Sequence, residues 1–197
     1  MSAVDRLLSR EPGTPPRADA RRNLERLVTA TRSAVADTGV TVTAQEIAQR
    51  AGVGKGTFYR RVPSLEILLQ VVLEEVLEEA VAAADNALDN PDPWLGFTDF
   101  ATIYVRLRAE SCGVNEALGD IGAYDLDEFI TALQDRLRRL VERAQTVGAM
   151  RADISWQDTA FVLAGAATDP RTIGVQATPD QWNRNLRLIL DGLATHR

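Results

Sequence analysis

Apolar residues recur at spacings of three and four along most of the chain, and this period is typical of amphipathic α-helices. The first stripe predicts a helix over residues 19–38 that ends at Gly39, and a longer stripe predicts a helix after Ser64. We therefore expect an all-α chain of about nine helices. Later helices are predicted to begin at residues that suit an N-terminal cap, namely Asp92, Asp125, Ser155 and Thr178.

Two short helices are predicted within residues 43–62. Thr43 and Glu46 have the spacing of a capping box, in which each side chain satisfies a backbone N–H at the start of a helix. Gly52 suits the left-handed conformation at the end of that helix, and residues 55–62 then form the second helix. A glycine-containing turn between two helices indicates a helix-turn-helix whose second helix enters a DNA major groove. Composition alone leaves an alternative, a buried helical hairpin with a solvated basic face.

Charge is divided unevenly along the chain. The net charge is −6, yet residues 1–63 contain eleven Arg or Lys against six Asp or Glu, a surplus of five positive charges. The remaining residues contain eleven basic side chains against twenty-two acidic ones. A basic N-terminal third is suited to contact DNA phosphates, and the acidic remainder would be repelled by DNA and would help to keep the protein in solution.

The length and hydrophobicity of the chain limit its class. The 197 residues, 45% of them hydrophobic, suit one compact helical unit or two small cooperating domains. No apolar run approaches the roughly 20 residues that a membrane helix needs, and the N-terminus lacks the apolar centre of a signal peptide. We expect a soluble, cytoplasmic protein.

Little in the sequence suits catalysis or metal binding. Cys112 is the only cysteine, and the only histidine, His196, is next to the last residue. No glycine-rich phosphate loop follows a predicted strand. We therefore expect no enzymatic activity, no metal and no cofactor. Cys112 is interpreted as a reduced, partly buried thiol, with a redox sensor as the alternative.

The sequence AGVGKGTFYRRVPSLEILL, which follows TAQEIAQR, resembles the recognition region of TetR-type transcriptional regulators. It departs from the family at Gly54, Arg61 and Leu65, where serine, histidine and a basic residue are frequent. Lys55 is expected to donate to guanine O6 and N7 or to a phosphate, and Tyr59 to hold a phosphate. The residues predicted to contact DNA are Thr43, Lys55, Gly56, Thr57, Tyr59, Arg60, Arg61, Ser64, Arg17 and Arg22.

The start of the chain is rich in proline. Residues 1–17 are predicted to form a flexible arm, from which Arg17, together with Arg22, could reach phosphates or an adjacent minor groove. A solvated tail that ends in an ordinary helix start is the alternative. Residues 18–63 are then predicted to form a three-helix DNA-binding domain.

Residues 64–197 are predicted to form a larger helical domain for ligand binding and dimerisation. The run WLGFTDFATIYVRLRAESCGVNEALGD resembles the SbtR-like C-terminal domain of some TetR-type regulators, with departures at Val114 and Asn115. The resemblance implies a small-molecule effector and a connecting helix that carries ligand-induced movement to the DNA-binding domain. Spacing alone favours an aromatic core over a pocket, and a mostly apolar pocket with a few polar groups is the alternative. The predicted pocket residues are Trp94, Phe97, Phe100, Tyr104, Cys112 and Phe129.

The last two predicted helices combine large apolar residues with small ones, which suits a two-fold four-helix contact. A homodimer would also place two helix-turn-helix motifs on a palindrome. The alternative is that these helices only close the core of the subunit. The residues predicted for the dimer interface are Trp156, Phe161, Ala164, Gly165, Trp182, Leu186, Ile189 and Leu190.

These observations predict a one-component transcriptional regulator that binds double-stranded DNA. The expected mechanism is repression, relieved when a small-molecule effector releases the homodimer from a palindromic operator. The alternative function is a helical small-molecule adaptor or carrier without sequence-specific DNA binding.

Overall fold

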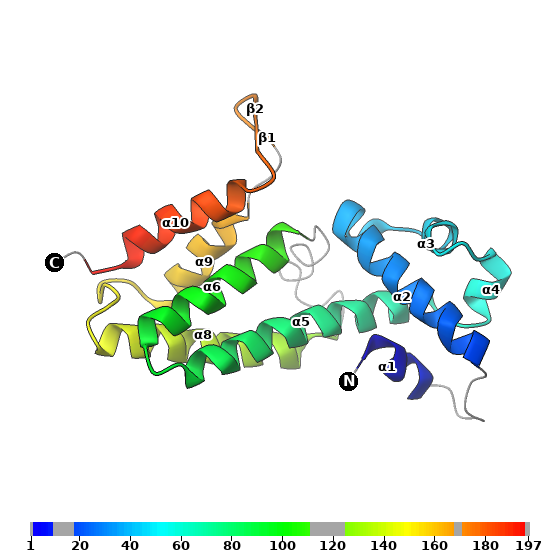
Figure 1. Ribbon diagram of the computed structural model, residues 1–197, viewed down its shortest axis with the longest axis horizontal. Helices are drawn as coiled ribbons and strands as arrows, with labels where there is room; N and C mark the ends of the chain where they lie inside the picture. Colours follow the sequence, from blue (N-terminus) through cyan, green and yellow to red (C-terminus); the bar gives the residue numbers. More distant parts are fainter. Residues whose placement is uncertain (1, 10–17, 111–124, 168–170, 196–197) are drawn as a thin grey trace. The chain divides into compact units, whose positions relative to one another are not determined.

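The computed structural model describes residues 2–9, 18–110, 125–167 and 171–195. Within these ranges the chain forms nine α-helices, so the prediction of an all-α fold is confirmed (Figure 1). The helices are α1 (Ala3–Ser9), α2 (Ala18–Thr38), α3 (Ala44–Arg50), α4 (Lys55–Tyr59), α5 (Leu65–Asp89), α6 (Pro93–Ala109), α8 (Asp127–Thr146), α9 (Trp156–Ala166) and α10 (Gln181–Leu193).

Two short elements complete the described structure. A 3₁₀ turn, η1 (Gly39–Thr41), connects α2 to α3. The strands β1 (Arg171–Thr172) and β2 (Val175–Gln176) pair antiparallel between α9 and α10. This hairpin was not predicted, because the region contains glycine and proline and each strand is only two residues long.

The helices gather into two compact units. The first unit extends to Leu77 and also includes the described residues 125–127. The second unit begins at Glu78, so the division falls inside the continuous helix α5. The first unit thus extends past the predicted domain boundary at Pro63. In this part of α5, Glu74 and Glu75 form ion pairs with α1 and α2.

Local sequence signals place several helix ends as predicted. Ser64 accepts a hydrogen bond from the Ile67 N–H at 3.2 Å and begins α5. The Asp92 carboxylate accepts two backbone N–H bonds in the first turn of α6. Ser155 and Asp158 form a capping box at the start of α9. These contacts lie within three residues along the chain, which is why they can be recognised in the sequence.

Two predicted helix starts are displaced in the structure. α8 begins at Asp127, two residues after Asp125. α10 begins at Gln181 with Asp180 at its N-cap, while Thr178 donates its hydroxyl to the Asp180 carboxylate at 3.0 Å. Thr178 therefore holds the capping residue and does not cap the helix itself.

The prediction of a flexible arm over residues 1–17 is wrong for the first part of that range. Residues Ala3–Ser9 form helix α1, with Ala3, Val4 and Leu7 buried. A helix of this length would be unstable on its own, and α1 is stabilised by packing against α2. The remainder of the predicted arm, including Arg17, lies outside the described residues.

Ion pairs connect α1, α2 and α5 to one another. Arg21 on α2 pairs with Asp5 on α1 at 3.2 Å. Arg32 on α2 pairs with Glu75 on α5. Arg6 on α1 pairs with Glu74 on α5 at 3.3 Å, and these two side chains are only 10% and 11% exposed. Each of the three helices is thus tied to the other two, and the third pair is buried.

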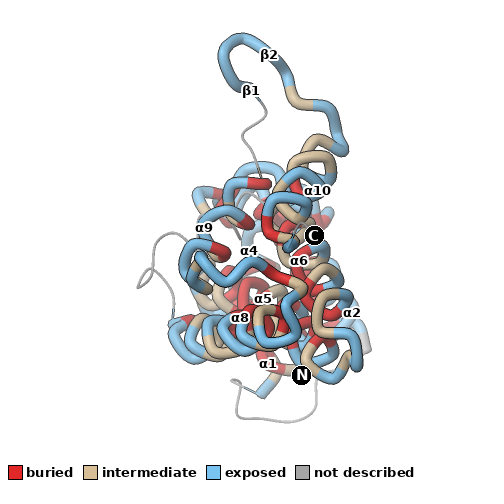
Figure 2. The backbone as a smooth tube through the Cα atoms, turned by 90° about the vertical axis from the view of Figure 1, so that its left-hand side faces the viewer, coloured by how far each residue is buried: buried red, intermediate tan, exposed pale blue. Residues whose placement is uncertain are grey.

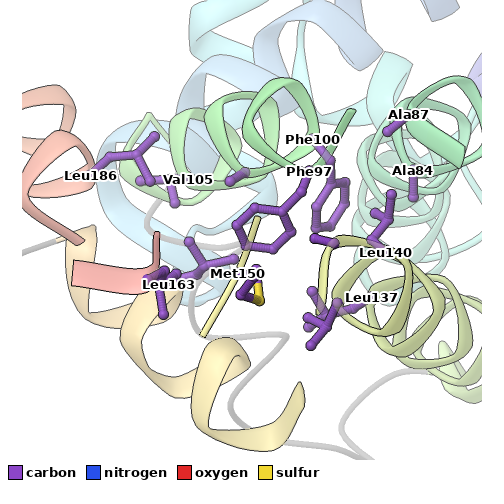
Figure 3. Packing of buried hydrophobic residues seen from close by; sticks show 14 of the residues in the cluster. Ala84, Ala87, Phe97, Phe100, Val105, Leu137, Leu140, Met150, Leu163 and Leu186 are labelled. Carbon is purple, nitrogen blue, oxygen red and sulfur yellow. The ribbon is translucent and has the colours of Figure 1, made fainter. Parts of the chain in front are cut away.

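The core of the second unit is built around the aromatic face of α6. Phe97 and Phe100 are fully buried among side chains from α5, α8, α9 and α10 (Figure 3). Phe97 stacks on Trp94 with ring centroids 5.7 Å apart, and Phe100 stacks on Tyr104 at 5.6 Å. Phe97 and Phe100 therefore pack as core residues in this structure.

Gly96 allows α6 to approach the end of α5 closely. A Cβ at this position would lie 2.3 Å from the carbonyl oxygen of Ala87 and 3.2 Å from the Asn90 Cβ. Because the first contact is with backbone, we expect Gly96→Ala to lower the free energy of unfolding by about 1–3 kcal/mol in urea titrations. Gly192→Ala is the control, since a Cβ there meets no atom within 4 Å. That change should raise stability by about 0.5 kcal/mol, and a loss similar to that of Gly96→Ala would contradict the steric explanation.

Candidate nucleic-acid interface

The capping box at the start of α3 forms as predicted. The Glu46 carboxylate accepts from the Thr43 backbone N–H at 2.8 Å and from the Thr43 hydroxyl at 2.7 Å. In return, the Glu46 N–H donates to the Thr43 hydroxyl oxygen at 3.3 Å. The two bonds from Thr43, first the backbone and then the hydroxyl bond, lower the pKa of Glu46. The ionised carboxylate therefore fixes the N-terminus of α3.

The turn after α3 depends on a glycine. Gly52 has a φ of +63°, and the Val53 N–H donates to the Ala48 carbonyl at 3.0 Å. This pattern is a Schellman motif, in which a left-handed residue ends a helix. Arg26 on α2 donates to the Gly52 carbonyl at 3.2 Å. Sequence reasoning missed Arg26, because no local signal relates two positions 26 residues apart.

α4 presents one apolar face to the core and leaves its other faces open. Phe58 and Val62 are fully buried, whereas Lys55, Gly56 and Tyr59 are exposed. The helix ends at Tyr59 and not at Val62 as predicted, and Arg60 and Arg61 follow in a turn. The predicted arrangement, two short helices joined by a tight turn with the second one exposed, is present (Figure 1).

The basic side chains of this region differ in whether they form hydrogen bonds or ion pairs within the protein. Arg60 folds back on its own helix and donates to the Gly56 carbonyl at 3.2 Å and to the Thr57 hydroxyl at 3.1 Å. Arg22 pairs with Asp19 at the start of α2. The side chains of Lys55 and Arg61, in contrast, form no hydrogen bond or ion pair with any described residue. These two cations are the ones available to a ligand without breaking an existing contact.

Three of the predicted DNA-contacting residues lie around one groove. Thr43, Tyr59 and Ser64 line a surface depression of about 490 Å³ between the start of α3, the end of α4 and the start of α5. Tyr59 packs its ring edge to face against Phe58, with centroids 5.1 Å apart, so its orientation is supported by a buried neighbour. The groove therefore brings two helix starts and a phenol together on one surface.

The predicted pocket residues differ in how deeply they are buried. Phe97 and Phe100 are buried in the core, and Trp94, Tyr104 and Phe129 are partly buried. The Tyr104 hydroxyl accepts a hydrogen bond from Arg108 at 3.0 Å. Cys112 lies outside the described residues.

The predicted dimer residues also fall into two groups. Phe161 and Gly165 are exposed one turn apart on α9, and a Cβ added to Gly165 would meet nothing within 4 Å. Leu186, in contrast, is buried in the core of its own unit. The other predicted interface residues, Trp156, Ala164, Trp182, Ile189 and Leu190, are partly buried.

Comparison with known proteins agrees with this geometry. A model of bacterial regulatory proteins of the tetR family matches residues 27–72, and a model of the transcriptional regulator SbtR-like C-terminal domain matches residues 92–195. Among curated proteins none matches.

Solved structures of TetR regulators share the fold. A TetR transcription regulatory protein from Mycobacterium vanbaalenii is 31% identical, with a TM-score of 0.58, over 92% of this chain and 100% of that one. The TetR regulator SCO0520 from Streptomyces coelicolor is 24% identical, with a TM-score of 0.63, over 88% and 99%. RolR in complex with resorcinol is 25% identical, with a TM-score of 0.50, over 89% of each chain. The chain thus belongs to the TetR family of DNA-binding transcriptional regulators and carries an SbtR-like C-terminal domain.

Proposed function

We propose that this regulator is a homodimeric repressor whose two α4 helices read the half-sites of a palindromic operator and which a small-molecule effector releases. The observation that carries this proposal is the exposed surface of α4 and of the turn after it, where the side chains of Lys55 and Arg61 form no hydrogen bond or ion pair with a described residue, while buried Phe58 anchors the helix. A helix held in this way can enter a major groove without losing internal contacts.

The chemistry of these side chains supports a different proposed role for each. Lys55, at the N-terminal end of α4, would reach base edges and donate to guanine O6 and N7. Thr43, Tyr59 and Ser64, which line the groove beside α4, would hold backbone phosphates, with Arg61 as a further phosphate contact. Base contacts then specify the sequence, and phosphate contacts fix the register.

The exposed apolar residues of α9 and α10 support the homodimer. Phe161 is 80% exposed and Leu188 is 72% exposed, although both are large apolar side chains. Gly165, one turn after Phe161, has no side chain and open space around it, so a second helix could approach closely there. A two-fold contact across these helices would cover this surface and would set the α4 helices about 34–36 Å apart for adjacent major grooves.

The effector is proposed to act on the second unit. Trp94 and Tyr104 are partly buried against the apolar core and combine aromatic surface with one hydroxyl, and Phe129 is a further partly buried aromatic residue. The binding of resorcinol by RolR supports a small aromatic effector for this chain. α5 contributes residues to both units, so it is the proposed path of the signal. A thousandfold loss of operator affinity requires about 4 kcal/mol of differential effector binding.

Selection of bound DNA from a random library, at low and at moderate salt, tests the proposal. We expect enrichment of a palindrome whose half-sites are near one helical turn apart. If binding weakens with salt but no motif is enriched, the basic surface contacts phosphates alone. In that case the adaptor or carrier function would replace the repressor.

Two substitutions on α4 separate base reading from phosphate contact. Lys55→Ala should weaken operator binding by about 1–3 kcal/mol per half-site and relax the preference at one base position. Tyr59→Phe keeps the ring against Phe58 and should weaken binding equally on all sequences. The measurement is a binding profile of each variant on the selected site and its single-base variants. An unchanged preference in Lys55→Ala would assign Lys55 to a phosphate.

A further inference from the structure

The hairpin between α9 and α10 is exposed along both of its strands. Arg171 pairs with Gln176 and Thr172 with Val175, and all four residues are exposed. Both views show it standing away from the helices of its unit (Figures 1 and 2). An isolated two-stranded hairpin is at best marginally stable in water, so further contacts are needed to hold it.

The tip of the hairpin is strained as well as apolar. Ile173 and Gly174 have φ values of +41° and +82°, and two positive φ values are the requirement of a tight hairpin turn. Asparagine or glycine usually occupies the first of these positions, and a β-branched residue there is unfavourable. Ile173 is nevertheless 97% exposed, and Val175 beside it is 60% exposed. In one subunit alone, therefore, the isoleucine brings strain and an exposed apolar surface without a compensating contact.

The hairpin and the two helices that flank it in the sequence contain most of the exposed large hydrophobic residues. Eight large hydrophobic residues are exposed among the described parts of the chain, and five of them lie between positions 161 and 188. Large exposed apolar side chains gathered in one part of a protein are typical of an interaction site. The five are Phe161, Val162, Ile173, Val175 and Leu188.

Charges on the same helix fit a contact between two identical surfaces. Arg187 and Asp191 are both exposed on α10, and neither forms an ion pair with a described residue. In a two-fold contact, residue i of one subunit meets residue j of the other, and the reverse also holds. Two side chains of opposite sign on one face can therefore pair across the axis.

We propose that the β1–β2 hairpin is a dimerisation arm whose tip, Ile173 and Val175, packs on the α9–α10 surface of a second copy of this chain. The proposal rests on the homodimer proposed above and adds a contact outside the helical face. Because the hairpin lies between α9 and α10 in the sequence, each arm belongs to the same segment as the helices of the proposed interface. Each arm would cover apolar surface of the partner while the partner's arm does the same in return.

The substitution Ile173→Gly should maintain or raise the stability of the subunit but weaken the dimer. Glycine relieves the positive φ, so the thermal stability of the subunit should stay the same or rise. Loss of the apolar side chain should raise the dimer dissociation constant about 10- to 100-fold in sedimentation equilibrium. Val175→Thr keeps the strand preference and should also weaken the dimer. Dimer dissociation constants equal to that of the wild type in both variants would overturn the proposed arm.

A second pair of variants separates the arm from the dimer itself. Gly165→Arg places a large charged side chain in open space on α9 and should give a folded monomer. Thr102→Arg, at an exposed position of α6, is the control and should remain dimeric. If Gly165→Arg is monomeric and the two hairpin variants are not weakened, the arm is wrong and the helical dimer stands. If the wild type sediments as a monomer at tens of micromolar, both the dimer and the arm are wrong.

Discussion

Replacing Arg6 with methionine should lower the free energy of unfolding by about 3–5 kcal/mol, because it leaves the Glu74 carboxylate buried without its cation. Both side chains are about nine-tenths buried, and the pair joins α1 to α5. The remaining hydrogen bond to Glu74, from the Gln70 amide at 2.9 Å, does not neutralise the charge. Urea titration followed by circular dichroism at 222 nm, a wavelength that reports helix, measures the loss.

The double variant Arg6→Met, Glu74→Met distinguishes loss of a pair from loss of packing. Removing both charges leaves no buried ion, so most of the stability should return, and the double variant is expected to be near the wild type or above it. Arg21→Met is a matched control, since its pair with Asp5 is solvent-exposed and its loss should change stability by less than about 1 kcal/mol. Similar losses from Arg6→Met and Arg21→Met would show that the Arg6 pair is hydrated in solution.

Phe97→Ala should lower the free energy of unfolding by about 3–5 kcal/mol, since it removes a fully buried ring and leaves a cavity in a close-packed core. The lost contacts include the stacked Trp94 ring and the side chains of α8, α9 and α10 around it (Figure 3). Urea titration measures this change in the same way.

The size of the Phe97 effect also tests the two interpretations of the aromatic cluster. Leu95→Ala is the control on the same helix. Because Leu95 is half exposed, this substitution should lower the free energy of unfolding much less than Phe97→Ala. If Phe97 lined an open, hydrated effector pocket, its truncation would remove few contacts and the two variants would have similar stabilities. A large difference between them would assign Phe97 to the core and leave effector contact to the partly buried aromatic residues.

Features that depend on neighbours in sequence were predictable. The Thr43–Glu46 box, the left-handed Gly52 and the Ser155 cap all formed where the residue types placed them. Each depends on hydrogen bonds that span five residues or fewer, so the sequence pattern contains the whole interaction. The same holds for the long apolar stripe that forms α5 from Leu65.

Features that depend on distant partners were not predictable. Helix α1 is too short to form alone, and its stability comes from α2 and from the ion pair between Arg6 and Glu74, 68 positions apart. Arg60 is an exception among local contacts: its bonds to Gly56 and Thr57 span only four and three residues, but they depend on a side-chain rotamer that the sequence does not reveal. The hairpin turn lacks the usual Asn-Gly signal, because Ile173 occupies the first left-handed position.

The division of the chain inside α5 has a consequence for engineering chimeric sensors. Because the helix runs without interruption through Leu77 and Glu78, a fusion made there must preserve helical phase. One inserted residue turns every following side chain by about 100° about the helix axis, whereas seven residues add nearly two full turns. Chimeras whose junctions differ in length by a heptad should therefore respond alike, and those that differ by two or five residues should lose their response.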